Sequence, residues 1–156
     1  MKPEIQQYPF GARPDVNKPN PEFLTFMGES GVRKLVSRHY DLMHKSSIAH
    51  LFPKDPEEFE TAKKHSADFF IQICGGPEYF NQNRGKPMLI GRHSHFSIDA
   101  EGRQVWLECY HQALLEFNIP ENLFNSFWEY IQVFSAWMIN SKTTRNRPEA
   151  DSISFQ

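Results

Sequence analysis

The sequence predicts an all-α domain that follows an extended N-terminal arm. Apolar residues recur at spacings of three and four over several long stretches, as they do on the buried face of a helix. Almost no stretch alternates between apolar and polar residues with the period of two that is typical of strands. Asp and Pro residues precede the periodic stretches, and Gly and Pro residues follow them, where helices begin and end. The 156 residues match the usual size of one domain.

We expect three parts in the chain: an extended arm over 1–20, a globular domain over 21–140 and a flexible C-terminal tail over 141–156. The tail is polar and contains Pro148, so we expect it to fray. The arm carries four prolines, which prevent a regular helix because each lacks a backbone donor and fixes its own φ. These prolines are Pro3, Pro9, Pro14 and Pro19.

Within the globular part we expect four long helices and one short helix. The long helices cover 31–45, 55–74, 99–117 and 123–138, and the short helix covers 87–93. Ser30 or Glu29 can cap the first helix, while Asp55 and Asp99 are the expected caps of the second and of the third long helix. Residues 77–85 are expected to form a loop, because two glycines and a proline stop the second helix just before them.

Composition excludes several classes of partner. The net charge is −2 and no basic run is present, so we expect no nucleic acid partner. No apolar leader opens the chain and no run approaches 18 apolar residues, so we expect neither export nor a membrane span. Cys74 and Cys109 stand far apart, without the spacing of a metal site or a disulfide framework. Two reduced thiols indicate a cytoplasmic protein.

No motif for chemistry by side chains alone stands out. The chain has no nucleophile elbow of the G-x-S-x-G type, no phosphate-binding loop and no G-x-G-x-x-G fingerprint. One E-x-x-H pair is formed by Glu108 and His111, but a di-iron helix bundle requires this pair on two helices. A haem site needs less: one neutral imidazole, an apolar slot with aromatic walls, and a cation at its rim.

The stretch from Gly85 to Ile98 offers such an imidazole. His93 can act as the axial ligand, with Leu89 one turn before it and Phe96 after it as apolar walls. Arg92 would point away from them, towards a rim. These residues alone do not decide between His93 and His95 as the ligand. The 14 phenylalanines suit a core that packs against a large flat group, although an ordinary aromatic core would have the same composition.

Six motifs follow one another with the order and spacing of a known family. They are Leu35-Val36-Ser37-Arg38-His39-Tyr40, Leu51-Phe52-Pro53, Phe69-Phe70, Gly75-Gly76-Pro77, the stretch Gly85 to Ile98, and Arg103-x-x-Trp106-Leu107. In these motifs the sequence resembles the group II truncated haemoglobins, over about Gly28 to Asn140. The resemblance implies a truncated, two-over-two globin fold and a haem b cofactor.

The resemblance also assigns roles to residues. It implies that His93, and not His95, is the proximal ligand of the iron. Tyr40 and Trp106 would face the open side of the iron and donate hydrogen bonds to a bound ligand, with Ser66 as a further contact. The expected haem contacts are Phe52, His65, Phe69, Met88, Leu89, Arg92, His93, Phe96, Ile98 and Trp106. Among these, His65 and Arg92 would meet the propionates.

Three functions follow as hypotheses. The resemblance implies a globin that reversibly binds O2 and other diatomic ligands such as NO and CO, in oxygen binding or transport. The alternative is a haem enzyme for NO dioxygenation or peroxide turnover, supplied by an electron donor that the sequence does not identify. A third hypothesis is a helical interaction domain without haem, which docks partners through the proline-rich arm over 1–20.

Overall fold

The computed structural model describes residues 3–94 and 96–142. Within these residues the chain is all-α and contains no strand. The elements are α1 (Glu22–Met43), the short 3-10 turn η1 (Ala49–Leu51), α2 (Pro56–Ile73), α3 (Tyr79–Arg84), α4 (Leu89–Arg92), α5 (Ala100–Leu114), the 3-10 turn η2 (Leu115–Phe117) and α6 (Glu121–Trp137). His95 and residues 143–156, which make up most of the expected tail, lie outside the described residues.

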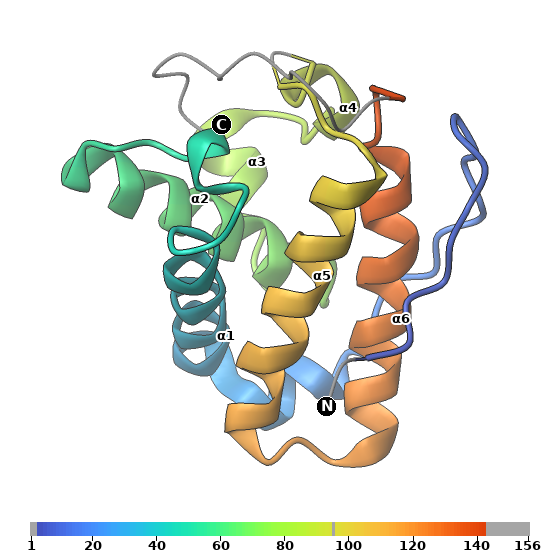
Figure 1. The fold of residues 1–156 in the computed structure, drawn as a ribbon. Coiled ribbons are helices and arrows are strands. Elements are labelled where there is room, and N and C mark those ends of the chain that lie inside the picture. Colours follow the sequence, from blue (N-terminus) through green and yellow to red (C-terminus); the bar gives the residue numbers. More distant parts are fainter. Residues whose placement is uncertain (1–2, 95, 143–156) are drawn as a thin grey trace.

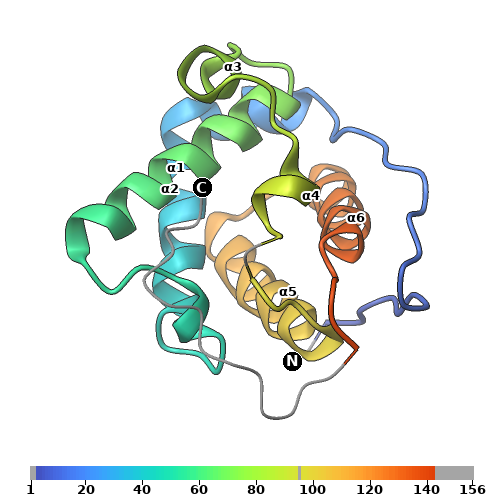
Figure 2. The ribbon, with the colours of Figure 1, turned by 90° about the horizontal axis from the view of Figure 1, so that it is seen from above.

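The long helices form two layers that enclose one core. Helices α5 and α6 run antiparallel, and α1 packs against both α2 and α5 (Figure 1). The short helix α4 lies at one end of the bundle, between α2 and α6 (Figure 2). Aromatic rings fill the centre, where Phe127 stacks on Phe23 at 4.5 Å and contacts both Phe70 and Tyr110 at 5.6 Å between ring centroids. This arrangement is the predicted two-over-two fold.

Helix α1 begins earlier than the sequence pattern predicted. Glu22 to Met27 form a first segment, and Gly28 then interrupts the helix with φ 69° and ψ 164°. The predicted start near Gly31, with Ser30 or Glu29 as cap, was wrong, because the interruption was mistaken for the beginning of the helix. The first segment forms because Phe23, which is fully buried, anchors it in the core.

The two predicted aspartate caps are confirmed. Asp55 accepts a hydrogen bond from the backbone N–H of Glu58 at 3.0 Å, at the start of α2. Asp99 does the same for Gly102 at 2.7 Å, at the start of α5. Each carboxylate satisfies a backbone donor that the helix itself leaves unpaired.

Residues 77–85 were predicted to be loop, but six of them form α3. This helix is held by tertiary contacts: Phe80 is buried, and the side chain of Gln72 both accepts from the backbone N–H of Asn81 and donates to its side chain, each at 3.0 Å. The polar sequence from Asn81 to Arg84 carries no helical periodicity of its own. Packing against α2 therefore determines this element.

The N-terminal arm lies along α6 (Figures 1 and 2). Residues 3–20 contain no helix. The indole N–H of Trp137 donates to the carbonyl of Pro14 at 2.8 Å, and the backbone N–H of Gln6 donates to the side chain of Gln132 at 2.7 Å. The arm is thus docked on the bundle through α6. No helix of the described residues is long and apolar enough to cross a membrane.

Candidate functional site

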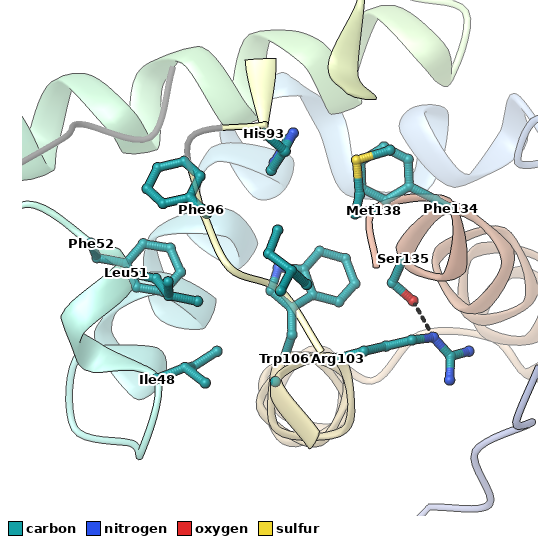
Figure 3. A pocket seen from close by; sticks show the side chains of 12 residues that line it. Ile48, Leu51, Phe52, His93, Phe96, Arg103, Trp106, Phe134, Ser135 and Met138 are labelled. Carbon is teal, nitrogen blue, oxygen red and sulfur yellow. Dashed lines mark hydrogen bonds between the residues drawn. The ribbon is translucent and has the colours of Figure 1, made fainter. Parts of the chain in front are cut away.

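His93 lies at the end of α4 and projects into a cavity between α4 and α5 (Figure 3). Its Nδ1 is 2.7 Å from the carbonyl oxygen of Leu89. A carbonyl only accepts, so Nδ1 carries the proton and Nε2 keeps a lone pair. Burial lowers the pKa of His93, which keeps the imidazole neutral. His93 is therefore prepared to bind a metal through Nε2.

The cavity has two adjoining parts that share His93, Trp106 and Phe134. They hold about 550 Å³ and 480 Å³ of empty space, part of it open to solvent. Trp106 faces His93 from across the first part (Figure 3). The first part is lined mainly by apolar side chains, among them Ile48, Leu51, Phe52, Phe96, Ile98 and Met138.

The second part brings polar groups of α1 and α2 to the cavity. Tyr40 and Ser66 both line it. Burial raises the pKa of Tyr40 and the nearby Ser66 hydroxyl opposes the rise, so the phenol stays protonated and its O–H is a donor. The indole N–H of Trp106 forms no hydrogen bond with any described residue. The phenol of Tyr40 and the indole of Trp106 thus both lie at the second part of the cavity.

His39 forms a hydrogen bond with the backbone of Trp106. Its Nε2 donates to the backbone carbonyl of Trp106 at 3.0 Å, and its ring stacks on Tyr110 at 3.6 Å between centroids. Burial lowers the pKa of His39 to about 3, so the ring is neutral and Nε2 keeps its proton. His39 therefore joins α1 to α5.

Most of the residues predicted for the site come together. Phe52, Phe96, Ile98 and Trp106 line the first part of the cavity, Tyr40, His65, Ser66, Phe69 and Leu89 line the second, and His93 and Trp106 belong to both. Met88 does not: its side chain is 73% exposed and lines only a separate outer groove. The backbone of Met88 is left-handed, with φ 41°.

Sequence reasoning missed several cavity residues. Phe134 lines both parts, and Met138, one turn later on α6, lines the first. Both residues belong to the apolar stripe from which the last helix was predicted, but the stripe did not show that they face a cavity. Arg103 also lines the first part, where its Nε donates to Ser135 at 3.0 Å. Spacing alone does not indicate which face of a helix meets a cavity.

Positive charges gather beside the second part of the cavity. His65 lines it, and its Nδ1 is buried without a hydrogen-bond partner among the described residues. Burial lowers the pKa of His65, and the charges of Arg84, Lys64 and Arg92 lower it further, against the opposing effect of Asp68. A ligand carboxylate at this place would face these positive charges and would supply the missing hydrogen-bond partner of the His65 nitrogen.

Arg92 is engaged elsewhere. Its guanidinium donates to the backbone carbonyls of Pro87, Arg84 and Lys86, at 2.6, 2.7 and 3.1 Å, and lies over the ring of Phe80. Among the described residues, no three His, Cys, Asp or Glu side chains gather in a metal site. A metal at this cavity therefore needs a carrier that supplies its other ligands, such as a porphyrin.

A two-over-two helical bundle with one buried histidine facing a tryptophan across an apolar cavity defines a truncated globin. The model of the bacterial-like globin family matches residues 25–140, and the chain belongs to that family. Membership implies a haem cofactor and small diatomic ligands such as O2. The resemblance to group II truncated haemoglobins is confirmed by the relatives of the chain.

Three relatives illustrate the match. Group 2 truncated hemoglobin YjbI of Bacillus subtilis (strain 168) is 31% identical over 126 residues, which cover 78% of this chain and 90% of that protein. The crystal structure of phosphate-bound Hell's gate globin IV is 35% identical and covers 98% of this chain and 94% of that one, with a TM-score of 0.82. The hemoglobin of Chloroflexus aurantiacus is 32% identical, covers 76% of this chain and 97% of that one, and has a TM-score of 0.70.

Proposed function

We propose that this globin binds haem b through Nε2 of His93 and reversibly holds O2, NO or CO on the opposite side of the cavity. One observation carries the proposal: the carbonyl of Leu89 fixes the proton of His93 on Nδ1, at 2.7 Å. An imidazole held in this way presents a lone pair to the cavity in one orientation, which is how axial histidines are held in metal sites.

The residues of the cavity fit a haem. Apolar and aromatic side chains, among them Phe52, Phe69 and Phe96, would contact the faces and edges of the porphyrin. The unsatisfied Nδ1 of His65 and the nearby Arg84 would meet its carboxylates. When bound, the haem supplies an iron with one open coordination position for a diatomic ligand.

The protein controls that position through its distal donors. Tyr40 is neutral because burial raises the pKa of its phenol, so its O–H can donate to a polar ligand. The indole N–H of Trp106 is a donor only, and no described residue competes for it. Ser66 lines the same part of the cavity as Tyr40. Donors of this kind slow the release of O2 more than that of CO, since bound O2 carries more negative charge.

The two cysteines support a reducing compartment, and we propose the cytoplasm. Both Cys74 and Cys109 are free thiols. Burial raises the pKa of Cys74 to about 12 and, with the charge of Glu108, that of Cys109 to about 11. Neither thiol forms a thiolate readily, so neither is a reactive group.

An absorption spectrum tests the proposed function. The purified full-length protein should carry a Soret band, shift it on reduction, and shift it again when CO is added. The oxygenated ferrous protein should then release O2 slowly in a stopped-flow displacement by CO. A protein that takes up no haem, or whose ferrous spectrum does not change with CO, would contradict the proposal.

A further inference from the structure

The arginine next to His93 is bonded to the backbone of its own loop. We propose that Arg92 is a positioning residue that fastens the segment 84–88 to α4 and so sets the orientation of His93, instead of binding a haem carboxylate. The proposal rests on the proposed function in so far as His93 is taken to hold the iron. Nothing in the family match or in the relatives assigns this role to Arg92.

The guanidinium of Arg92 donates to three backbone carbonyls at once. Nε donates to the carbonyl of Pro87 at 2.6 Å, and one terminal nitrogen donates to the carbonyls of Arg84 and Lys86 at 2.7 and 3.1 Å. The Cζ atom of the group lies over the ring of Phe80 on α3, 5.2 Å from the ring centroid. A rigid, planar set of donors is suited to such convergent acceptors, whereas a lysine ammonium is a point charge. One side chain thereby joins α3, the loop and α4.

The segment 84–88 and α4 have few other features that stabilise their conformation. Helix α4 has only four residues, and Met88 before it adopts a left-handed conformation with φ 41°. Such a conformation is unfavourable for a residue with a side chain and persists only when the surroundings enforce it. Met88 is 73% exposed and Ile90 is 36% exposed, so of these neighbouring apolar residues only Leu89 packs against the core. The bonds of Arg92 supply the missing constraint.

The constraint reaches His93 through Leu89. The carbonyl of Leu89 accepts both the backbone N–H of His93 at 3.0 Å and its Nδ1–H at 2.7 Å. The backbone N–H of Arg92 is bonded to the carbonyl of Met88 at 3.1 Å. When the loop shifts, the first turn of α4 shifts with it, and the carbonyl that orients the imidazole moves. Arg92 therefore acts on the iron ligand without touching it.

The experiment compares three variants of the full-length haem protein. Arg92→Gln removes the charge and most of the planar set of donors. Arg92→Lys keeps the charge but loses the planar arrangement of the donors. Lys86→Gln is the matched control, because it removes an exposed positive charge in the same loop but leaves the Lys86 carbonyl that Arg92 uses. Hydrogen exchange of the peptide 84–94, followed by mass spectrometry, reports on the loop. The iron–histidine stretching band in the resonance Raman spectrum of the ferrous protein reports on His93.

We expect Arg92→Gln and Arg92→Lys to speed exchange in 84–94 by on the order of tenfold, since bonds from a charged donor are lost. Both should shift or broaden the iron–histidine band, and both effects should persist in protein reconstituted with haem dimethyl ester, which has no carboxylates. Lys86→Gln should leave exchange and band unchanged.

Two results would overturn the proposal. In the first, Arg92→Lys behaves as the wild type, so that charge alone matters. In the second, the Arg92→Gln effects disappear with haem dimethyl ester, which would make Arg92 a carboxylate partner. A wild-type protein without any iron–histidine band would instead refute the proposed function, and the exchange data would still decide whether Arg92 fastens the loop.

Discussion

At the scale of single residues, the site depends on two buried imidazoles, each oriented by a backbone carbonyl. Leu89 fixes the proton of His93 on Nδ1, and Trp106 fixes that of His39 on Nε2. The first arrangement leaves a lone pair that faces the cavity, and the second holds the backbone of Trp106. The same type of side chain thus offers a lone pair on one side of the cavity and supports the wall on the other.

We predict that Tyr40→Phe speeds the dissociation of O2 by about tenfold or more, because one hydrogen bond to a partly charged ligand is lost. Stopped-flow displacement of O2 by CO measures the rate. Tyr110→Phe is the matched control: its hydroxyl is also buried, but it lines no part of the cavity and has no hydrogen-bond partner among the described residues. An unchanged rate in Tyr40→Phe would rule out the distal role of this residue.

The composition of the cavity was largely predictable from the sequence at this scale, because motif order placed His93, Tyr40 and Trp106 together. Two features were not predictable. Met88 has a left-handed backbone, which leaves no signal in the sequence pattern, and it lines a separate groove outside the cavity. The guanidinium of Arg92 binds carbonyls of its own loop, which only the path of the loop reveals.

At the scale of elements, α1 shows how one backbone position shapes a helix. Gly28 adopts φ 69° and ψ 164°, which is accessible to glycine but strained for other residues. A Cβ at this position would meet no atom within 4 Å, so the strain is purely conformational. The interruption lets the segment from Glu22 to Met27 turn Phe23 into the core against Phe127.

We predict that Gly28→Ala lowers the free energy of unfolding by about 1–3 kcal/mol, the usual cost of a forced backbone conformation. Urea denaturation of the haem protein measures it. Gly91→Ala is the control, since Gly91 also has open space around its Cα but has no positive φ, and alanine favours a helix. Equal stability of Gly28→Ala and the wild type would show that the interruption is not required.

The elements that the sequence predicted well are those with strong local signals. Asp55 and Asp99 stand before clear apolar periodicity, and both cap their helices. Helix α3 was missed because its residues are polar and its stability comes from Phe80 and Gln72 packing against α2. Signals that depend on distant contacts cannot be read from local spacing.

At the scale of the whole molecule, the buried histidines couple stability to pH. The pKa of His39 is about 3 in the folded chain, against an ordinary value of 6.5. Between these values the unfolded chain takes up a proton that the folded chain refuses, so the free energy of unfolding falls as the pH falls. This contribution is complete above about pH 6.5 and is lost as the pH approaches 3.

We therefore predict that the wild-type protein loses about 2 kcal/mol of stability through His39 alone between pH 7 and pH 5. His39→Phe keeps a ring beside Tyr110 but cannot titrate, so its loss over the same interval should be smaller by this amount. Urea denaturation at both pH values measures the difference. Parallel losses in the two proteins would mean that His39 is not the group responsible.

The overall fold followed from the sequence because the periodic helices and the ordered motifs agree with each other. The docking of the arm did not: its prolines exclude a helix, but only the structure shows the carbonyl of Pro14 accepting from Trp137 of α6. Extended segments bind through backbone groups, which every sequence possesses, so their position leaves little trace in the residue pattern.

The most direct test of the central claim, that His93 holds the iron, is chemical rescue of the axial ligand. In His93→Gly, haem binding and the five-coordinate ferrous spectrum should be lost or altered, and free imidazole added to the solution should restore the wild-type spectrum. His95→Gly should keep the wild-type spectrum without imidazole. If His93→Gly retains the wild-type spectrum on its own, or if His95→Gly is the variant that requires imidazole, the assignment of the ligand is wrong.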